Sequence, residues 1–116
     1  MSLKDSLYHI VSCESGKAVV RLDPSSPVYA AHFPGYPITP GVILIEIATE
    51  LLSEEACVCG VALELSEAVN VKFVSPVIPG AETLLTYLFA PDGELRWKVN
   101  VLCSETLCAK MTLQYR

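Results

Sequence analysis

The residues best suited to chemistry lie in one short stretch, "HFPGYPITPGVILIE", which runs from His32 to Glu46. It begins with a histidine in a loop rich in proline and glycine, and it ends with an acid inside an apolar run. Histidine exchanges protons near neutral pH, and a carboxyl group in an apolar setting can hold a proton and deliver it to a leaving group. The pair therefore predicts general acid–base chemistry.

Glu46 is the unusual member of this pair, because acidic side chains are rarely buried without a partner. On a helix, burial within "VILIEIATELL" would favour its protonated form, and a second acid one turn later, Glu50, would act in the same direction. Alternatively, Glu46 and Glu50 share a narrow exposed stripe. His32, taken alone, also fits a hydrogen-bonded structural residue of the loop.

Gly41 follows Pro40 where the helix is expected to begin. The first N–H groups of a helix have no acceptor within the helix and carry the positive end of its dipole. Glycine lets an oxygen atom approach the backbone closely, so a thioester carbonyl bound there would be polarised and an enolate-like charge stabilised. Base, acid and carbonyl site together suit elimination of water from a thioester. The alternative is a plain glycine at the start of a helix.

A loop and a helix must position these residues. The loop "DPSSPVYAAHFPGYPITPG" has five prolines and two glycines in nineteen residues, which predicts an ordered but irregular segment. Residues 42 to about 55 predict a helix, because "ILIEIATELLSEE" is too long for a strand. Apolar residues lie on nearly every side of it, so we expect burial by more than one surface.

The remaining segments predict strands. Two short ones, Tyr8–Val11 and Ala18–Leu22, are joined by "SCESGK", and four or five follow residue 60, with "PDG" indicating a tight hairpin. We therefore predict an α+β fold, one domain over residues 1–116, in which an antiparallel sheet wraps around one long central helix. The uncovered face and edges of such a sheet favour dimerisation.

Composition excludes several classes of protein. A hydrophobic fraction of 52% argues against disorder, and a net charge of −5 argues against nucleic-acid binding. The apolar run from residue 42 to 52 is far shorter than the roughly 20 residues that span a bilayer. Five cysteines, an odd count without a secretory signal, favour reduced thiols and a cytoplasmic location.

The cysteines give little sign of a metal site. Cys57 and Cys59 form a CxC without a nearby histidine, so we expect no metal. Cys103 and Cys108 flank a predicted turn and could approach each other, although two small apolar residues in strands is the simpler interpretation.

The stretch "HFPGYPITPGVILIE" matches the pattern HFPGxPxxPGVxxxE, and it resembles the active-site segment of the 3-hydroxyacyl-[acyl-carrier-protein] dehydratases of bacterial fatty acid synthesis. "VKFVSPVIPGAE" is similar to that family's strand and PVxPG turn, so the resemblance covers the chain from about Glu14 onward. It implies a hotdog fold, with His32 removing the α-proton, Glu46 protonating the departing hydroxyl and the Gly41 N–H holding the carbonyl.

The resemblance also implies substrate contacts at Phe33, Pro34 and Val42, no cofactor, and a substrate carried by acyl-carrier protein or coenzyme A. It implies a homodimer, or a larger assembly of dimers, whose sites take histidine and glutamate from different subunits. The pathway could be fatty acid or aryl polyene synthesis. The alternatives are a hotdog thioesterase and a non-catalytic acyl-binding protein.

Two departures from the family pattern concern charge. Glu50 stands where many members have glutamine. Of the basic residues usual before the PV turn only Lys72 remains, and Arg96, Lys98 and Lys110 are possible substitutes on later strands.

Overall fold

The computed structural model describes residues 7–14, 16–23, 41–53, 64–75, 77, 84–103 and 106–115, without the side chain of Val42. Their elements, in chain order, are β1 (Tyr8–Glu14), β2 (Lys17–Leu22), α2 (Gly41–Leu52), β3 (Leu65–Phe73), β4 (Leu84–Pro91), β5 (Arg96–Cys103) and β6 (Thr106–Tyr115). The predicted sequence of two strands, a helix and then further strands is confirmed.

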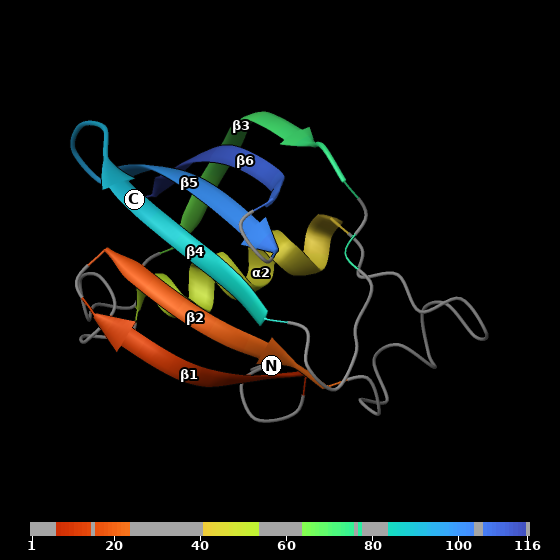
Figure 1. Cartoon of the computed structure of the whole chain (residues 1–116). Helices are drawn as coiled ribbons and strands as arrows, with labels where there is room; N and C mark the ends of the chain where they lie inside the picture. Colours follow the sequence, from red (N-terminus) through yellow and green to blue (C-terminus); the bar gives the residue numbers. More distant parts are fainter. Residues whose placement is uncertain are drawn as a thin grey trace.

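The described strands form one six-stranded sheet in the order β1-β2-β4-β5-β6-β3, with every neighbouring pair antiparallel. The helix α2 lies against one face of this sheet, which curves around it (Figure 1). Strands β1 and β3 are the two edges. The predicted α+β arrangement, an antiparallel sheet around a helix, is therefore confirmed.

The alternation of buried and exposed side chains along the strands shows which face of the sheet covers the helix. In β4, Leu85, Tyr87 and Phe89 are buried, whereas Leu84 and Leu88 between them are exposed. Successive side chains of a strand point to opposite faces, so one face of the sheet forms the core with α2 and the other is open in the single chain.

The first hairpin is tighter than predicted. Strand β1 continues to Glu14 and β2 already begins at Lys17, so most of the predicted turn "SCESGK" belongs to the strands. The turn includes Gly16 at φ +80°, where a β-carbon would also lie 3.2 Å from the carbonyl oxygen of Phe89. Glycine is therefore required by both the backbone angle and the close approach.

The buried side of α2 consists of Leu44, Ile47, Ala48, Leu51 and Leu52, which follow the spacing of a single helical face. The sheet covers this face, and burial of the helix by a second surface stays a prediction. The opposite side carries exposed Glu46 and Ser53 and half-buried Thr49 and Glu50.

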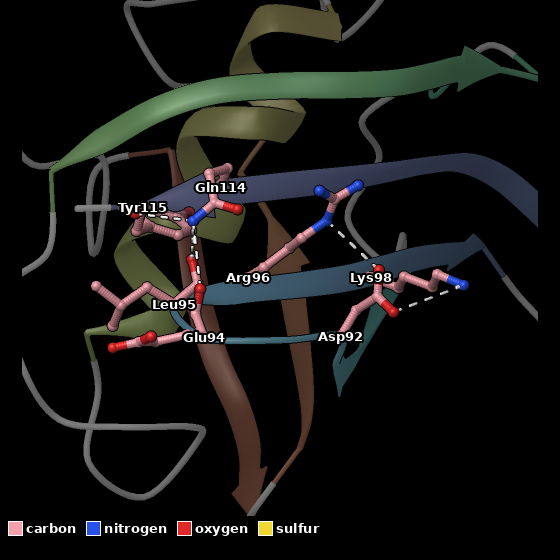
Figure 2. Close-up of polar contacts among 7 residues, drawn as sticks. All are labelled: Asp92, Glu94, Leu95, Arg96, Lys98, Gln114 and Tyr115. Carbon is pink, nitrogen blue, oxygen red and sulfur yellow. Dashed lines mark hydrogen bonds and ion pairs between the residues drawn. The ribbon is translucent and has the colours of Figure 1, made fainter.

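The hairpin predicted from "PDG" connects β4 and β5. Gly93 has φ +119° and Leu95 has φ +53°, so two residues of the connection adopt left-handed backbone angles. The Leu95 carbonyl accepts hydrogen bonds from the Tyr115 N–H at 2.8 Å and from Gln114 Nε2 at 3.2 Å. Figure 2 shows the Gln114 amide reaching this connection, which fixes the hairpin to the end of β6.

Candidate active site

Glu46 lies on the outer side of α2, facing away from the sheet, and its side chain is exposed in the single chain. It follows the helix start at Gly41 by five residues, which is about 7.5 Å along a helix axis. Side chains of a helix lean toward its N-terminus. We therefore expect the carboxyl group to point toward the helix end that was predicted as a carbonyl site.

Several predicted site residues cannot be placed beside it. His32, Phe33 and Pro34 lie outside the described residues, and so does the side chain of Val42. The structure thus brings together Glu46 and the helix start at Gly41, while the approach of His32 to Glu46 stays a prediction.

Gly41 has a structural reason of its own to be glycine. A β-carbon added there would lie 2.6 Å from Cε2 and 2.7 Å from Cε1 of Phe73, because the ring of Phe73 packs directly on the Gly41 backbone. Phe73 is the last residue of β3 and is 54% exposed. The start of the helix is therefore flanked by an exposed aromatic ring, a contact that could not be predicted from the sequence.

Glu50 accepts a hydrogen bond, so it is not simply a second, unpaired negative charge one turn from Glu46. The Tyr8 hydroxyl donates to Glu50 Oε1 at 3.0 Å, and Tyr8 itself is fully buried. At the end of the helix, Ser53 Oγ donates to the Glu50 carbonyl at 2.9 Å. Glu50 is thus tied to β1, whereas Glu46 one turn earlier is exposed.

Two further tyrosines bind α2 in the same way. The buried Tyr87 hydroxyl, from β4, donates to the Leu44 carbonyl at 3.0 Å. The Tyr115 hydroxyl, from β6, lies 3.1 Å from Thr49 Oγ1. Together with Tyr8, these residues connect the helix to three separate strands. Their role is not evident from the sequence, although a tyrosine at an inward strand position indicates a buried hydroxyl that needs a partner.

The cysteines differ from the prediction of reduced thiols. Cys13 is disulfide-bonded, and its partner lies outside the described residues. The prediction is wrong here because an odd count does not prevent two cysteines from pairing once the fold brings them together. Cys103 and Cys108 are free. Burial raises the pKa of the Cys108 thiol, and the charge of Cys103 raises it further.

Neither a metal cluster nor a membrane span is found in the described part of the chain. Its His, Cys, Asp and Glu residues form no group of three that could hold a metal ion. Among the described residues, no helix is long and apolar enough to cross a bilayer. The cytoplasmic location expected from the sequence stays a prediction.

Comparison with known proteins identifies the family. Residues 10–112 match the model of the ApeI-like family, described as ApeI dehydratase. The chain belongs to the ApeI-like dehydratase family. A relative named 3-hydroxyacyl-[acyl-carrier-protein] dehydratase FabZ, from Pasteurella multocida (strain Pm70), is 32% identical over 118 residues, covering 87% of this chain and 78% of that protein.

Other relatives agree with this membership. The FabZ dehydratase of Polynucleobacter necessarius subsp. necessarius (strain STIR1) is 28% identical over 124 residues, which cover 88% of this chain and 80% of that protein. Among solved structures, the dehydratase heterocomplex ApeI:P from Xenorhabdus doucetiae is similar with a TM-score of 0.67 at 21% identity, over 92% of this chain and 93% of that one. The hotdog fold expected for this dehydratase is confirmed.

Proposed function

We propose that this dehydratase removes water from (3R)-3-hydroxyacyl thioesters to form trans-2-enoyl thioesters, in fatty acid or aryl polyene synthesis. One observation carries the proposal: in a chain of the dehydratase family, the acid of the motif HFPGxPxxPGVxxxE lies on an exposed helix face, five residues after the first residue of that helix. A substrate bound at the helix end would have its β-carbon toward Glu46.

The proposed reaction uses three groups. His32 takes the α-proton, and the resulting negative charge moves onto the thioester oxygen, which accepts a hydrogen bond from the Gly41 N–H. Glu46 gives its proton to the β-hydroxyl as the Cβ–O bond breaks and the double bond forms. Water leaves, and the proton taken by His32 passes to solvent while Glu46 regains one. The exposed Phe73 beside Gly41 offers apolar contact to the acyl chain.

We propose further that the active protein is at least a homodimer and that its substrate is carried by acyl-carrier protein. Glu46 is exposed in the single chain, which suits an acid that is covered by another subunit. The resemblance implies that His32 of that subunit completes the site. The relatives named above act on acyl-carrier-protein substrates according to their names.

The test follows interconversion of 3-hydroxyacyl and trans-2-enoyl thioesters by the absorbance of the enoyl group. Glu46→Gln and His32→Ala should each lower the rate by about 10²- to 10⁴-fold. Glu50→Gln is the matched control, because it makes the same chemical change one turn away on a residue held by Tyr8. Full activity in Glu46→Gln would refute the assignment, and release of free thiol instead of enoyl product would indicate a thioesterase.

Mixing the two inactive variants tests the shared site. If His32 and Glu46 of one site come from different subunits, exchange between His32→Ala and Glu46→Gln dimers creates some sites with both groups intact, giving about a quarter of the wild-type rate. If each site lies within one chain, mixing the two variants restores no dehydratase activity.

A further inference from the structure

The positively charged side chains of the described residues are collected on one surface. All six lysines and arginines of the described residues lie on the sheet face that points away from α2, and they are Lys17, Arg21, Lys72, Arg96, Lys98 and Lys110. They stand out because the whole chain has a net charge of −5. The outer face of the sheet is therefore suited to an anion, although the proposed dehydration leaves it unused.

On this face lies a hollow of about 240 Å³ lined by Asn70, Lys98, Asn100, Lys110, Met111 and Thr112, here called the Lys110 hollow. Its polar side chains come from three adjacent strands, β3, β5 and β6. The register places Lys110 opposite Asn100 on one side and opposite Lys72 on the other. Two like charges directly opposite each other are unfavourable in a sheet, and a bound anion would offset that cost.

An irregularity in the sheet accompanies the hollow. Between Val69, which pairs with Thr112, and Lys72, which pairs with Lys110, strand β3 carries one extra residue. Asn70 lies in this bulge with φ +52°, a left-handed angle that asparagine tolerates better than most residues. Bulges bend the strand and redirect a side chain, and here the redirected side chain is one wall of the Lys110 hollow.

The donors around the hollow are not used within the described part of the chain. There, Lys110 and Lys72 have no ion pair, and the side chains of Asn70, Asn100 and Thr112 make no hydrogen bond. Thr112 is only 5% exposed as a residue and lines the hollow, where its hydroxyl group is available to a ligand oxygen.

The positive charge of Lys98, beside Lys110 in the hollow, is partly balanced by the carboxylate of Asp92. Asp92 lies 3.4 Å from Arg96 Nε and 4.0 Å from Lys98 Nζ, and Figure 2 shows both side chains directed at this one carboxylate. Asp92 is thus shared between two cations and contributes no compensation to Lys110. The surplus of positive charge remains at the hollow.

We propose that the Lys110 hollow binds a phosphate group. The ligand class follows from the lining: ammonium groups that act as point charges, amide and hydroxyl donors, and no carboxylate among the lining residues. A site of this size takes a single phosphate group with part of the molecule that carries it. Free phosphate, the nucleotide end of coenzyme A and a phosphopantetheine arm share this chemistry.

The experiment titrates the full-length protein with inorganic phosphate by calorimetry, with sodium chloride at equal ionic strength as the reference. Lys110→Gln should weaken binding by about tenfold or more, and Thr112→Val by about threefold or more. Lys17→Gln is the matched control, because it removes the same charge from the same face on β2, outside the hollow. Asn100→Ala, at an exposed position, serves as a second hollow variant if Thr112→Val does not fold.

The relative losses of phosphate affinity among these variants decide whether the proposal holds. If Lys17→Gln weakens binding as much as Lys110→Gln, or if Thr112→Val and Asn100→Ala both leave affinity unchanged, the attraction is diffuse charge and the proposal is wrong. Absence of phosphate binding beyond that of chloride overturns it as well. Adenosine 3′,5′-bisphosphate and 4′-phosphopantetheine, titrated separately, identify the source: whichever binds more tightly than inorganic phosphate carries the group, and equal affinities assign the site to free phosphate.

Discussion

Replacing Tyr8 with phenylalanine removes the hydroxyl that donates to Glu50 Oε1 at 3.0 Å. Hydrogen bonds to charged groups contribute about 1.5–3 kcal/mol, and the half-buried Glu50 regains some hydration when the bond is lost, so we expect a cost of about 1 kcal/mol. With an unfolding entropy of about 2.1 cal/mol/K per residue, this lowers Tm by about 4 °C for a chain of 116 residues.

The pairwise part of this cost is measured with a double-mutant cycle. Tyr8→Phe, Glu50→Ala and the double variant are melted at one protein concentration, because any dimer makes Tm depend on concentration. We expect a coupling of about 0.5–1.5 kcal/mol between the two sites. A coupling below about 0.3 kcal/mol, the usual error of additivity, would show that the bond does not hold Glu50. Thr49→Val with Tyr115→Phe is the corresponding cycle on the other side of the helix.

Three other changes test separate features. Gly41→Ala should lower the free energy of unfolding because the new methyl group meets the ring of Phe73, and Phe73→Ala in the same chain should recover part of the loss; equal losses with and without the ring would contradict the contact. Because burial and Cys103 raise the pKa of Cys108 above its unfolded value, the folded state binds more protons at high pH, and stability should fall as pH rises above about 9. Cys108→Ala should flatten that decline in denaturant titrations, and an unchanged slope would refute the cause. Leu95→Gly should raise stability by about 0.5 kcal/mol by relieving φ +53°, as urea titration would measure, and an unchanged or lower stability would contradict strain at this residue.

The fold was largely predictable because its signals are local. Alternation in strands such as β4 and the apolar spacing of α2 follow from the residues themselves. The boundaries were less accurate: β1 and β2 extend into the predicted turn, because "SCESGK" contains polar residues that a two-strand ribbon tolerates on its open face. Burial of the helix by a second surface stays a prediction, since composition alone does not say how many surfaces a single chain provides.

The site was predictable only as a motif. Gly41 and Phe73 are thirty-two positions apart in sequence, and nothing in either residue shows that the ring covers the helix start. Likewise, the partner of Glu50 comes from β1, at the other edge of the sheet from β3. Such contacts depend on how strands pack around the helix. His32 and Glu46 are separated by only fourteen residues, yet that interval does not say whether the two residues belong to one site of a single chain or to the proposed site shared between two chains.

The three tyrosine hydroxyls that hold α2 have a consequence for how this protein can evolve. Each bond joins the helix to a different strand, so the helix cannot slide or rotate without losing several of them together. Its inner residues are thereby fixed by packing, whereas the outer positions around Glu46 contribute little to the core. Under the proposed function, substitutions at outer positions that make none of these hydrogen bonds would change the substrate side of the helix while its attachment to the three strands is kept.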